Sequence, residues 1–210
     1  MVWFRSLISS YWQSIDGDLL AIRRSQREIA ALSHPPLPAF AGMPDALEAM
    51  VTALEGQHQI NLSPPDHQLT LFNLGAVLIS AEAVAIAGSP ESANDWDAWF
   101  RETWPPYVLL TPAWPVLARR LQALLAGRIG DRETGQRLME EAIAIADRIG
   151  SRTEAAIARV QYAELLALDL QPETRKRRTE AIQRGRKGCR ELGIPFEHHA
   201  HRARTAFALG

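Results

Sequence analysis

The segments GDRETGQRLMEEAIAIADRIG (residues 130–150) and PETRKRRTEAIQRGRKGCRELG (residues 172–193) repeat one another with a shift of 43 positions. Within each segment the apolar or small residues recur at the three- and four-residue spacing of one helix face. The residues that coincide are Leu138 with Ala181, Met139 with Ile182, Ala142 with Gly185, Ile145 with Gly188, Ala146 with Cys189, Ile149 with Leu192, and Gly150 with Gly193. The two segments therefore predict two equivalent helices, each ended by a glycine.

A nearly constant interval extends this repeat towards the N-terminus. Gly88, Gly130 and Gln171 are separated by 42 and 41 positions. With a shift of 41, the apolar stripe that follows Pro115 falls on a second stripe: Leu117, Leu121, Leu124 and Leu125 on Ala158, Tyr162, Leu165 and Leu166. A period near 42 with two helices per unit is typical of a helical solenoid. Period-two alternation bounded by hairpin turns does not occur, so the predicted fold class is all-α, a solenoid of helical hairpins.

The rest of the chain is also predicted to be helical. Apolar spacing indicates helices at residues 2–15, 18–32, 45–55, 66–87 and 91–104. Asp18, Asp45 and Ser89 are suitable N-caps for the second, third and fifth of these helices. Residues 33–44 contain four prolines and predict a connector, because each proline lacks a backbone donor. We expect a single helical-repeat domain over residues 1–210, with its clearest repeats at 116–207.

Charge is distributed unevenly along a chain whose formal net charge is only −1. Residues 1–114 hold 12 acidic and 5 basic residues, whereas residues 115–210 hold 12 acidic and 18 basic residues. Such asymmetry can steer a charged partner or orient an assembly. With 47% hydrophobic residues in 210, the chain is long enough to bury a sizeable core, so disorder is not expected.

Features of the sequence also bear on cellular location. The N-terminal residues lack a long apolar run and a small-residue cleavage site, so no signal peptide is predicted. Asn73, Ser80 and Glu82 interrupt the apolar residues 69–88, which favours a buried central helix over a membrane span. The single cysteine, Cys189, is predicted to be a buried small residue in a reducing compartment. These features predict a cytoplasmic protein that does not associate with a membrane.

The pattern of residues 116–207 resembles the tetratricopeptide-like helical repeats at the C-termini of large bacterial signalling ATPases, including LuxR-type regulators and class III cyclases. Two stretches carry the resemblance: AGRIGDRETGQRLMEEAIAIADRIGSRTEAAIARVQYAELLAL and GCRELGIPFEHHAHRARTAF. Gly135 and Arg178 depart from the alanine common at their repeat position. The chain has no GxxxxGK[ST] phosphate loop, so the ATPase activity does not carry over. The resemblance implies a helical scaffold that binds a protein or peptide, with no cofactor and no catalytic residues.

Aromatic residues are concentrated in one short segment that could line an apolar groove for a peptide or small ligand. This segment contains Trp96, Trp99, Phe100, Trp104, Tyr107 and Trp114. The alternative is that these side chains form core between neighbouring helix pairs.

A second candidate surface is the basic helix at residues 175–190, with Arg175, Arg177, Arg184, Arg186 and Lys187. It could contact an acidic partner or nucleic acid phosphates, or be simply a solvated face. Nucleic acid is not the favoured partner, because few aromatic residues interleave with the charges and two glutamates interrupt them.

Other groups of residues give weaker evidence of a metal site or of catalysis. Glu197, His198 and His201 have the spacing of metal ligands on one helix face, but the repeat favours a polar outer surface on a terminal helix, and no metal site is predicted. Motifs of nucleophilic or metal-assisted catalysis do not occur. We therefore expect a non-enzymatic interaction or regulatory scaffold module. The alternatives are a binder of nucleic acid or acidic partners through residues 175–190, and an unrecognised helical enzyme.

Overall fold

The computed structural model describes residues 2–31, 42–56, 60–66, 73–103, 115–169 and 171–207, and these residues are mainly helical. The helices are α1 (Val2–Asp16), α2 (Leu19–Ala30), α3 (Met43–Leu54), α4 (Leu74–Ala87), α5 (Pro90–Thr103), α6 (Ala118–Arg128), α7 (Arg132–Ile149), α8 (Arg152–Leu166), α9 (Pro172–Leu192) and α10 (Phe196–Phe207). The β-type pairing in these ranges is a single bridge between Ile60 and Gly88. The all-α prediction is therefore confirmed for the described residues.

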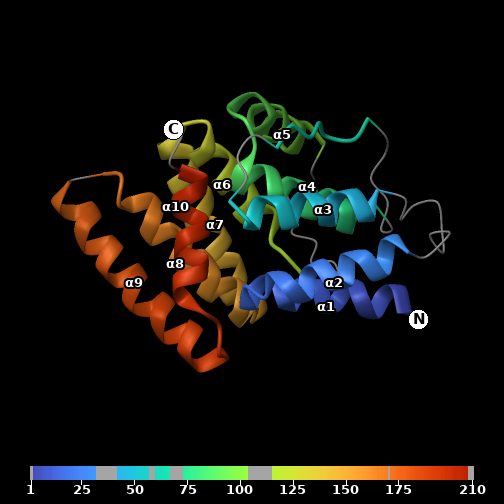
Figure 1. Ribbon diagram of the computed structural model, residues 1–210. Coiled ribbons are helices and arrows are strands. Elements are labelled where there is room, and N and C mark those ends of the chain that lie inside the picture. The colour runs from blue at the N-terminus through green and yellow to red at the C-terminus, as the bar shows by residue number, and fades with distance from the viewer. Residues whose placement is uncertain are drawn as a thin grey trace.

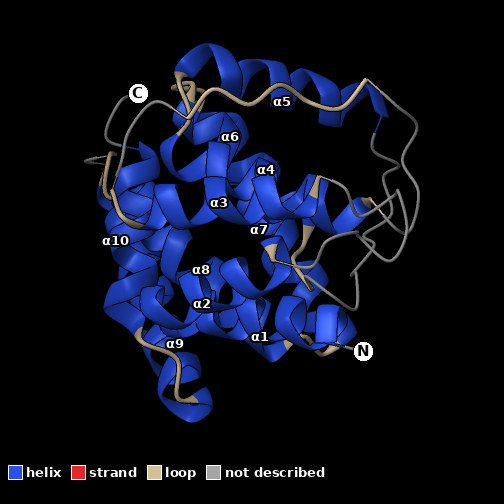
Figure 2. Ribbon diagram, turned by 45° about the vertical axis from the view of Figure 1, so that its right-hand side comes forward, coloured by secondary structure: helices blue, strands red, loops and turns tan. Residues whose placement is uncertain are grey.

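Most consecutive helices pack side by side, as Figure 1 shows. Helices α1 to α4 stack along one side of the molecule, and α5 lies across the top of α6. Helices α6, α7, α8 and α9 then follow one another in antiparallel order, and α9 projects at the far edge (Figures 1 and 2). Because α9 packs chiefly on α8, most of its surface faces solvent.

Turns of the same kind recur between the helices. In two places a Gly-Asp pair ends one helix and starts the next: the Asp18 carboxylate accepts a hydrogen bond from the Ala21 amide (3.0 Å), and the Asp131 carboxylate accepts one from the Thr134 amide (3.2 Å). Helices α7 and α9 both end at a glycine in the left-handed region, with φ of 72° at Gly150 and 71° at Gly193. A side chain would be strained there, which explains why glycine recurs at these positions.

Helix α10 does not continue the row of antiparallel neighbours. It makes few contacts with α9 and instead crosses α8, α6 and α4, so that it runs through the middle of the molecule (Figure 1). Its N-terminal turn also reaches α1, where His198 and His199 are hydrogen-bonded to backbone carbonyl oxygens. Helices α6 and α7 and helices α8 and α9 therefore each pack as neighbours, whereas α10 does not hold beside α9 the place that α8 holds beside α7.

One arginine ties the ends of three helices together. Arg128, the last residue of α6, is fully buried. Its guanidinium donates hydrogen bonds to the carbonyl oxygens of Ile86 (2.8 Å) and Gly88 (2.9 Å) at the end of α4, and of Thr205 (2.9 Å) at the end of α10. Carbonyl groups in the last turn of a helix have no partner within that helix and carry partial negative charge. Arg128 therefore satisfies and neutralises the C-terminal ends of α4 and α10.

Two predicted helix starts are wrong. Helix α4 begins at Leu74 rather than near Asp66, which lies in a non-helical stretch of residues 60–66. Helix α3 begins at Met43, so Asp45 lies within its first turn and is not its N-cap. In both cases prolines precede the helix in the sequence, and helix boundaries are the least certain part of a prediction from periodicity. The other two caps are confirmed, since Ser89 accepts a hydrogen bond from the Ser92 amide (3.1 Å) at the start of α5.

The predicted central helix is confirmed as part of the core. Helix α4 is buried on all sides, and Glu82 is its one buried charged residue. Within the described residues, no helix is both long enough and apolar enough to cross a membrane. Cys189 is buried on α9 as expected, and burial raises the pKa of its thiol.

Replacing Ala142 with leucine is expected to lower the free energy of unfolding by about 1–3 kcal/mol, because extra methylene groups overpack a close helix contact. Ala142 is fully buried, and a Cβ atom at its repeat equivalent, Gly185, would lie 3.0 Å from Val160 Cγ2. Urea denaturation would measure the change. Ala144→Leu, at an exposed position of the same helix, is the matched control. Equal denaturation midpoints for the two variants would contradict the close packing at Ala142.

Candidate functional site

A groove lies between α7 and α9 with α8 as its floor, and it consists of two adjoining cavities of about 340 and 360 Å³. The first cavity is lined by Glu140, Ile143, Ala144, Asp147, Arg159, Tyr162, Arg177, Glu180, Ala181 and Arg184. The second is lined by Asp147, Arg152, Ala155, Ala156, Arg159, Arg184, Lys187, Gly188, Glu191 and Leu192. Asp147, Arg159 and Arg184 line both, so they mark the centre of a continuous groove, which we call the α7–α9 groove.

The sequence produces this groove because each wall is one face of a regular helix. The lining residues of α9 recur at three- and four-residue intervals from Arg177 to Glu191. At about 1.5 Å rise per residue, they span about 20 Å. Small residues of α9, namely Ala181, Gly185 and Gly188, let this helix approach α8 closely, since a Cβ atom at Gly188 would lie 2.9 Å from Ala156 Cβ. Close packing of α9 on α8 leaves the open space on the side towards α7.

Ion pairs cross the α7–α9 groove or run along its walls. At the centre, the Arg159 guanidinium donates to both carboxylate oxygens of Asp147 (2.8 and 2.6 Å). At one end, Arg177 of α9 pairs with Glu140 of α7, and both groups are hydrogen-bonded to the Tyr162 hydroxyl. Burial and the Glu140 carboxylate raise the pKa of Tyr162, so its hydroxyl stays protonated and donates to Glu140. The groove therefore offers donors and acceptors of both charge signs.

At the other end of the groove, Arg152 and Lys187 share the Glu191 carboxylate, at 3.0 and 3.9 Å. Arg184 differs from these residues. It is exposed at the groove centre and makes no ion pair with any residue in the described part of the chain. Glu180, which lies one turn earlier on α9 and lines the same cavity, also makes no ion pair within the described residues.

The structure separates the basic residues that the sequence grouped together. Arg177, Arg184 and Lys187 line the α7–α9 groove. Arg186 is turned towards α10, with its guanidinium 4.8 Å from the centre of the Phe196 ring, and Arg175 is exposed near the start of α9. The sequence analysis missed the α7 and α8 walls, although Glu140, Ile143, Ala144 and Asp147 have the spacing of one helix face.

The aromatic segment is placed mostly in the core where it is described. Trp96 and Phe100 are buried, and the Trp96 indole N–H donates to the Leu62 carbonyl oxygen (2.8 Å). Trp99 is half-buried and packs edge-on against both rings. Trp104, Tyr107 and Trp114 lie outside the described residues. Of the two interpretations, the structural one therefore holds for Trp96 and Phe100, which do not line a surface groove.

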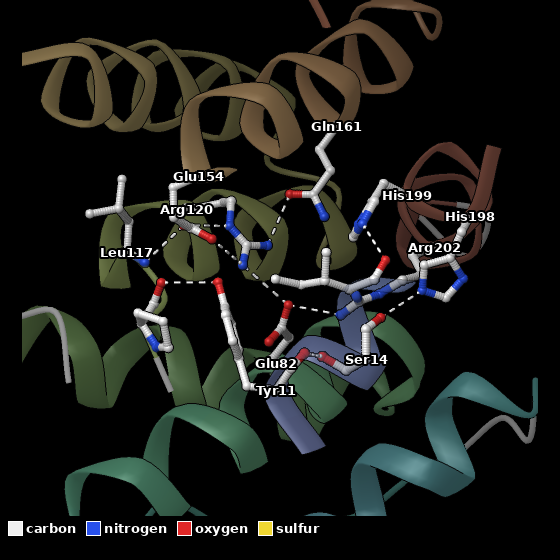
Figure 3. Close-up of polar contacts among 12 residues, drawn as sticks. Tyr11, Ser14, Glu82, Leu117, Arg120, Glu154, Gln161, His198, His199 and Arg202 are labelled. Carbon is white, nitrogen blue, oxygen red and sulfur yellow. Dashed lines mark hydrogen bonds and ion pairs between the residues drawn. The ribbon is translucent and has the colours of Figure 1, made fainter. Parts of the chain in front are cut away.

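A buried polar network, which the sequence analysis also missed, connects helices that are distant in the chain (Figure 3). Arg120 of α6 is its centre. The guanidinium donates to Glu154 through two nitrogens (2.9 and 3.1 Å), to Gln161 (3.1 Å) and to Glu82 (3.2 Å). Arg202 of α10 donates to the same Glu82 oxygen (2.8 Å). The two carboxylates and two guanidinium groups balance in charge.

The residues of this network are buried and are therefore inaccessible to ligands. Arg120, Glu154 and Arg202 are each exposed by 5% or less, so no ligand reaches them. Burial tends to lower the pKa of Arg120, but the Glu154 and Glu82 carboxylates outweigh it and raise that pKa. Glu154 also accepts a hydrogen bond from the Leu117 amide (2.9 Å) at the start of α6. The network therefore holds α4, α6, α8 and α10 together and is not a site for ligands.

Two histidines of α10 extend the polar contacts to α1 (Figure 3). The Nε2–H groups of His198 and His199 donate to the carbonyl oxygens of Ser14 (2.9 Å) and Ile15 (3.0 Å). His199 is fully buried and His198 is largely covered, so the predicted polar outer surface is wrong for these two residues, whereas Glu197 and His201 of the same cluster are exposed. Among the described residues, no group of three His, Cys, Asp or Glu side chains could hold a metal ion.

Acidification is expected to destabilise the protein through these histidines. Burial, reinforced by the nearby Arg202 guanidinium, lowers the pKa of His198 to about 4 and that of His199 well below 6.5. Below pH 6.5 the unfolded chain binds protons that the folded protein does not, so stability is complete above pH 6.5 and is lost as the pH falls towards 4. Because two histidines contribute, we expect a slope of about 2 kcal/mol per pH unit in urea denaturation between about pH 6 and 5.

The variant that checks this expectation replaces both histidines with glutamine, whose side-chain amide can still donate to Ser14 and Ile15 while carrying no titrating group. Its stability should change less than that of the wild type between pH 6.5 and 5. If the free energy of unfolding falls with pH equally in the variant and in the wild type, His198 and His199 have no role in this pH range.

Comparison of the chain with family models, with curated proteins and with solved structures finds no match. What the α7–α9 groove can bind follows from its own geometry and charges.

Proposed function

We propose that this protein is a non-enzymatic scaffold that binds a partner protein by accepting an extended segment of it in the α7–α9 groove. The observation that carries this proposal is the groove itself, about 20 Å long and walled by three helices. An extended peptide rises about 3.3 Å per residue, so the groove is long enough for about six residues. The donors and acceptors on its walls suit the alternating N–H and C=O groups of a peptide backbone.

The packing of neighbouring helices supports a rigid binding site. Helices α7, α8 and α9 pack as successive antiparallel neighbours, and the small residues of α9 hold it close to α8. A preformed site loses less conformational entropy on binding than a flexible one. The resemblance of residues 116–207 to tetratricopeptide-like repeats of bacterial signalling proteins agrees with this role. We therefore favour a cytoplasmic regulatory scaffold, in which the helical pairs form a solenoid-like platform.

The test uses an alanine in the α7 wall of the groove. Peptides of about twelve random residues, displayed on phage, would be selected against the whole protein, and the selected sequences synthesised. Ala144→Trp fills the groove at an exposed position and should weaken binding of these peptides by about tenfold or more. Ala98→Trp, at an exposed position of α5, is the matched control and should bind as the wild type does. Failure to select peptides, or equal binding by the two variants, would refute the proposal.

A second candidate is the binding of nucleic acid or an acidic partner through the outer face of α9. It is favoured by exposed basic side chains of α9 that do not line the groove: Arg175, Lys176 and Arg190. Phosphate contacts lose affinity steeply as salt concentration rises. Steep salt dependence of binding to an oligonucleotide, together with loss of binding in Arg175→Gln/Lys176→Gln, would support this candidate over the peptide groove.

A further inference from the structure

At the centre of the α7–α9 groove, the Arg184 guanidinium is not engaged by an ion pair within the described residues, and the Glu180 carboxylate one turn earlier on α9 is not engaged either. Arg159 is neutralised by two hydrogen bonds to Asp147, and Arg177 by Glu140. Arg184 lines both cavities but has no ion pair within the described residues. A guanidinium group in a groove, with donors unused, is well suited to a carboxylate, which it can bind through two parallel hydrogen bonds.

The position of Arg184 is fixed by the residue that follows it. At Gly185, a Cβ atom would lie 3.0 Å from Val160 Cγ2 and 3.2 Å from the Val160 backbone nitrogen, so α9 touches the α8 backbone at this point. The helix therefore cannot move away without opening this contact. Arg184 immediately precedes Gly185 in α9 and is exposed on the groove side. A cation on a rigid helix has a fixed position, so it can select the one position of a bound ligand that carries a negative charge.

The remaining charges of the groove distinguish a peptide from a nucleic acid strand. The walls carry four acidic side chains: Glu140, Asp147, Glu180 and Glu191. A nucleic acid strand carries a negative phosphate on every nucleotide, so more than one phosphate would lie along the groove and would face these acids. A peptide can place one carboxylate opposite Arg184 and present neutral groups or N–H donors to the acids. The charge pattern therefore fits a peptide with an isolated acidic residue.

We propose that the α7–α9 groove selects extended peptides with a carboxylate at their centre, and that Arg184 is the residue that recognises it. This inference rests on the proposed function, because it names the class of peptide that the same groove binds. It assigns specificity to one side chain of α9. The neighbouring Arg159 and Lys187 are already engaged by Asp147 and Glu191.

The experiment compares peptide preferences of single-residue variants. Phage-displayed peptides of about twelve random residues would be selected against the wild type, Arg184→Gln and Arg184→Glu. For the wild type we expect enrichment of Asp or Glu at one position, and about tenfold weaker binding when that residue is changed to its amide. Arg184→Gln should lose this preference and Arg184→Glu should shift it to Lys or Arg. Arg190→Glu, an exposed change on the same helix outside the groove lining, should retain the wild-type preference.

Each outcome bears on one of the two proposals. If peptides are selected and Ala144→Trp blocks them, but acids are not enriched or Arg184→Glu leaves the preference unchanged, the role of Arg184 is refuted while the peptide groove stands. If no peptides are selected, the proposed function itself fails. Tighter binding of a single-stranded oligouridylate than of any selected peptide, abolished in Arg184→Glu, would assign the groove to nucleic acid and overturn the inference.

Discussion

Replacing Arg120 with methionine is expected to lower the free energy of unfolding by about 3–5 kcal/mol, the largest effect among the changes considered. Methionine has a similar length but no charge and no donors. The change leaves the Glu154 carboxylate, buried beneath α6, without its guanidinium partner, and removes one of the two arginines on Glu82. An isolated buried charge is much less stable than a paired one, and no water reaches Glu154 in the folded protein to replace the pair.

Arg119→Met provides the matched control on the same helix. Arg119 is partly exposed and pairs with Glu141 at 3.3 Å, so its loss should cost less than about 1 kcal/mol. Urea denaturation at pH 7 would measure both variants. The double variant Arg120→Met/Glu154→Met should recover much of the lost stability, because apolar side chains can replace a buried ion pair. A similarly small effect of Arg119→Met and Arg120→Met would contradict the central role of the network.

Replacing Arg128 with methionine is expected to lower the free energy of unfolding by about 2–4 kcal/mol. The change removes the donors for the carbonyl oxygens of Ile86, Gly88 and Thr205, all at helix ends. Because these groups are enclosed by α6 and α10, each lost hydrogen bond leaves an acceptor without a partner. Amide hydrogen exchange should also accelerate in the last turns of α4 and α10 more than elsewhere, since Arg128 holds these ends together.

Arg137→Met is the control for this prediction. Arg137 is exposed on α7 and pairs with Glu141 at 2.6 Å one turn away, a contact of small energetic value. We expect its unfolding midpoint and exchange pattern to match those of the wild type. Uniform acceleration of exchange across all helices of the Arg128→Met protein would argue against a local role at the ends of α4 and α10.

The local elements of the fold could be predicted from the sequence because their determinants lie close together in the chain. The glycines that end α7 and α9 and the aspartates that start α2 and α7 act within one helical turn. The same holds for the stripe of small residues along α9, which the repeat aligned with the buried stripe of α7. For the same reason, the burial of Ala142, Gly185 and Cys189 could be predicted.

The buried network could not be predicted in the same way, because its members are 34 to 120 residues apart in the sequence. One feature of the sequence did indicate buried arginines on α6. Arg120 and Arg128 lie three residues after Leu117 and four after Leu124, on the buried side of α6. In a sequence such arginines look the same as those that extend their side chains to water at the edge of a helix. Only the positions of α4, α8 and α10 show that here they are enclosed.

The histidines of α10 show why the sequence repeat led to a wrong prediction of their exposure. Under the shift of 43, His198 and His199 coincide with Ala155 and Ala156, which are buried. A solenoid that simply ended at α10 would leave that face open, and this assumption produced the wrong prediction. Helix α10 crosses the earlier helices instead, and its histidines contact α1, a partner that no repeat could indicate. The α7–α9 groove was likewise visible only in part, because its α9 wall was recognised as a basic surface and its α7 wall was not.

The contact between α1 and α10 has a consequence for synthesis on the ribosome. Ser14 and His198 are separated by 184 residues, so this contact cannot form until nearly all of the sequence described here has left the exit tunnel. Until then Glu82 lacks Arg202, and the C-terminal end of α4 lacks the part of its cover that α10 supplies. Long-range contacts slow folding, and incompletely covered apolar helices are prone to aggregate. Until α10 emerges, the nascent chain thus exposes the part of α4 that α10 covers in the folded protein, and a chaperone would bind the chain most strongly in this period.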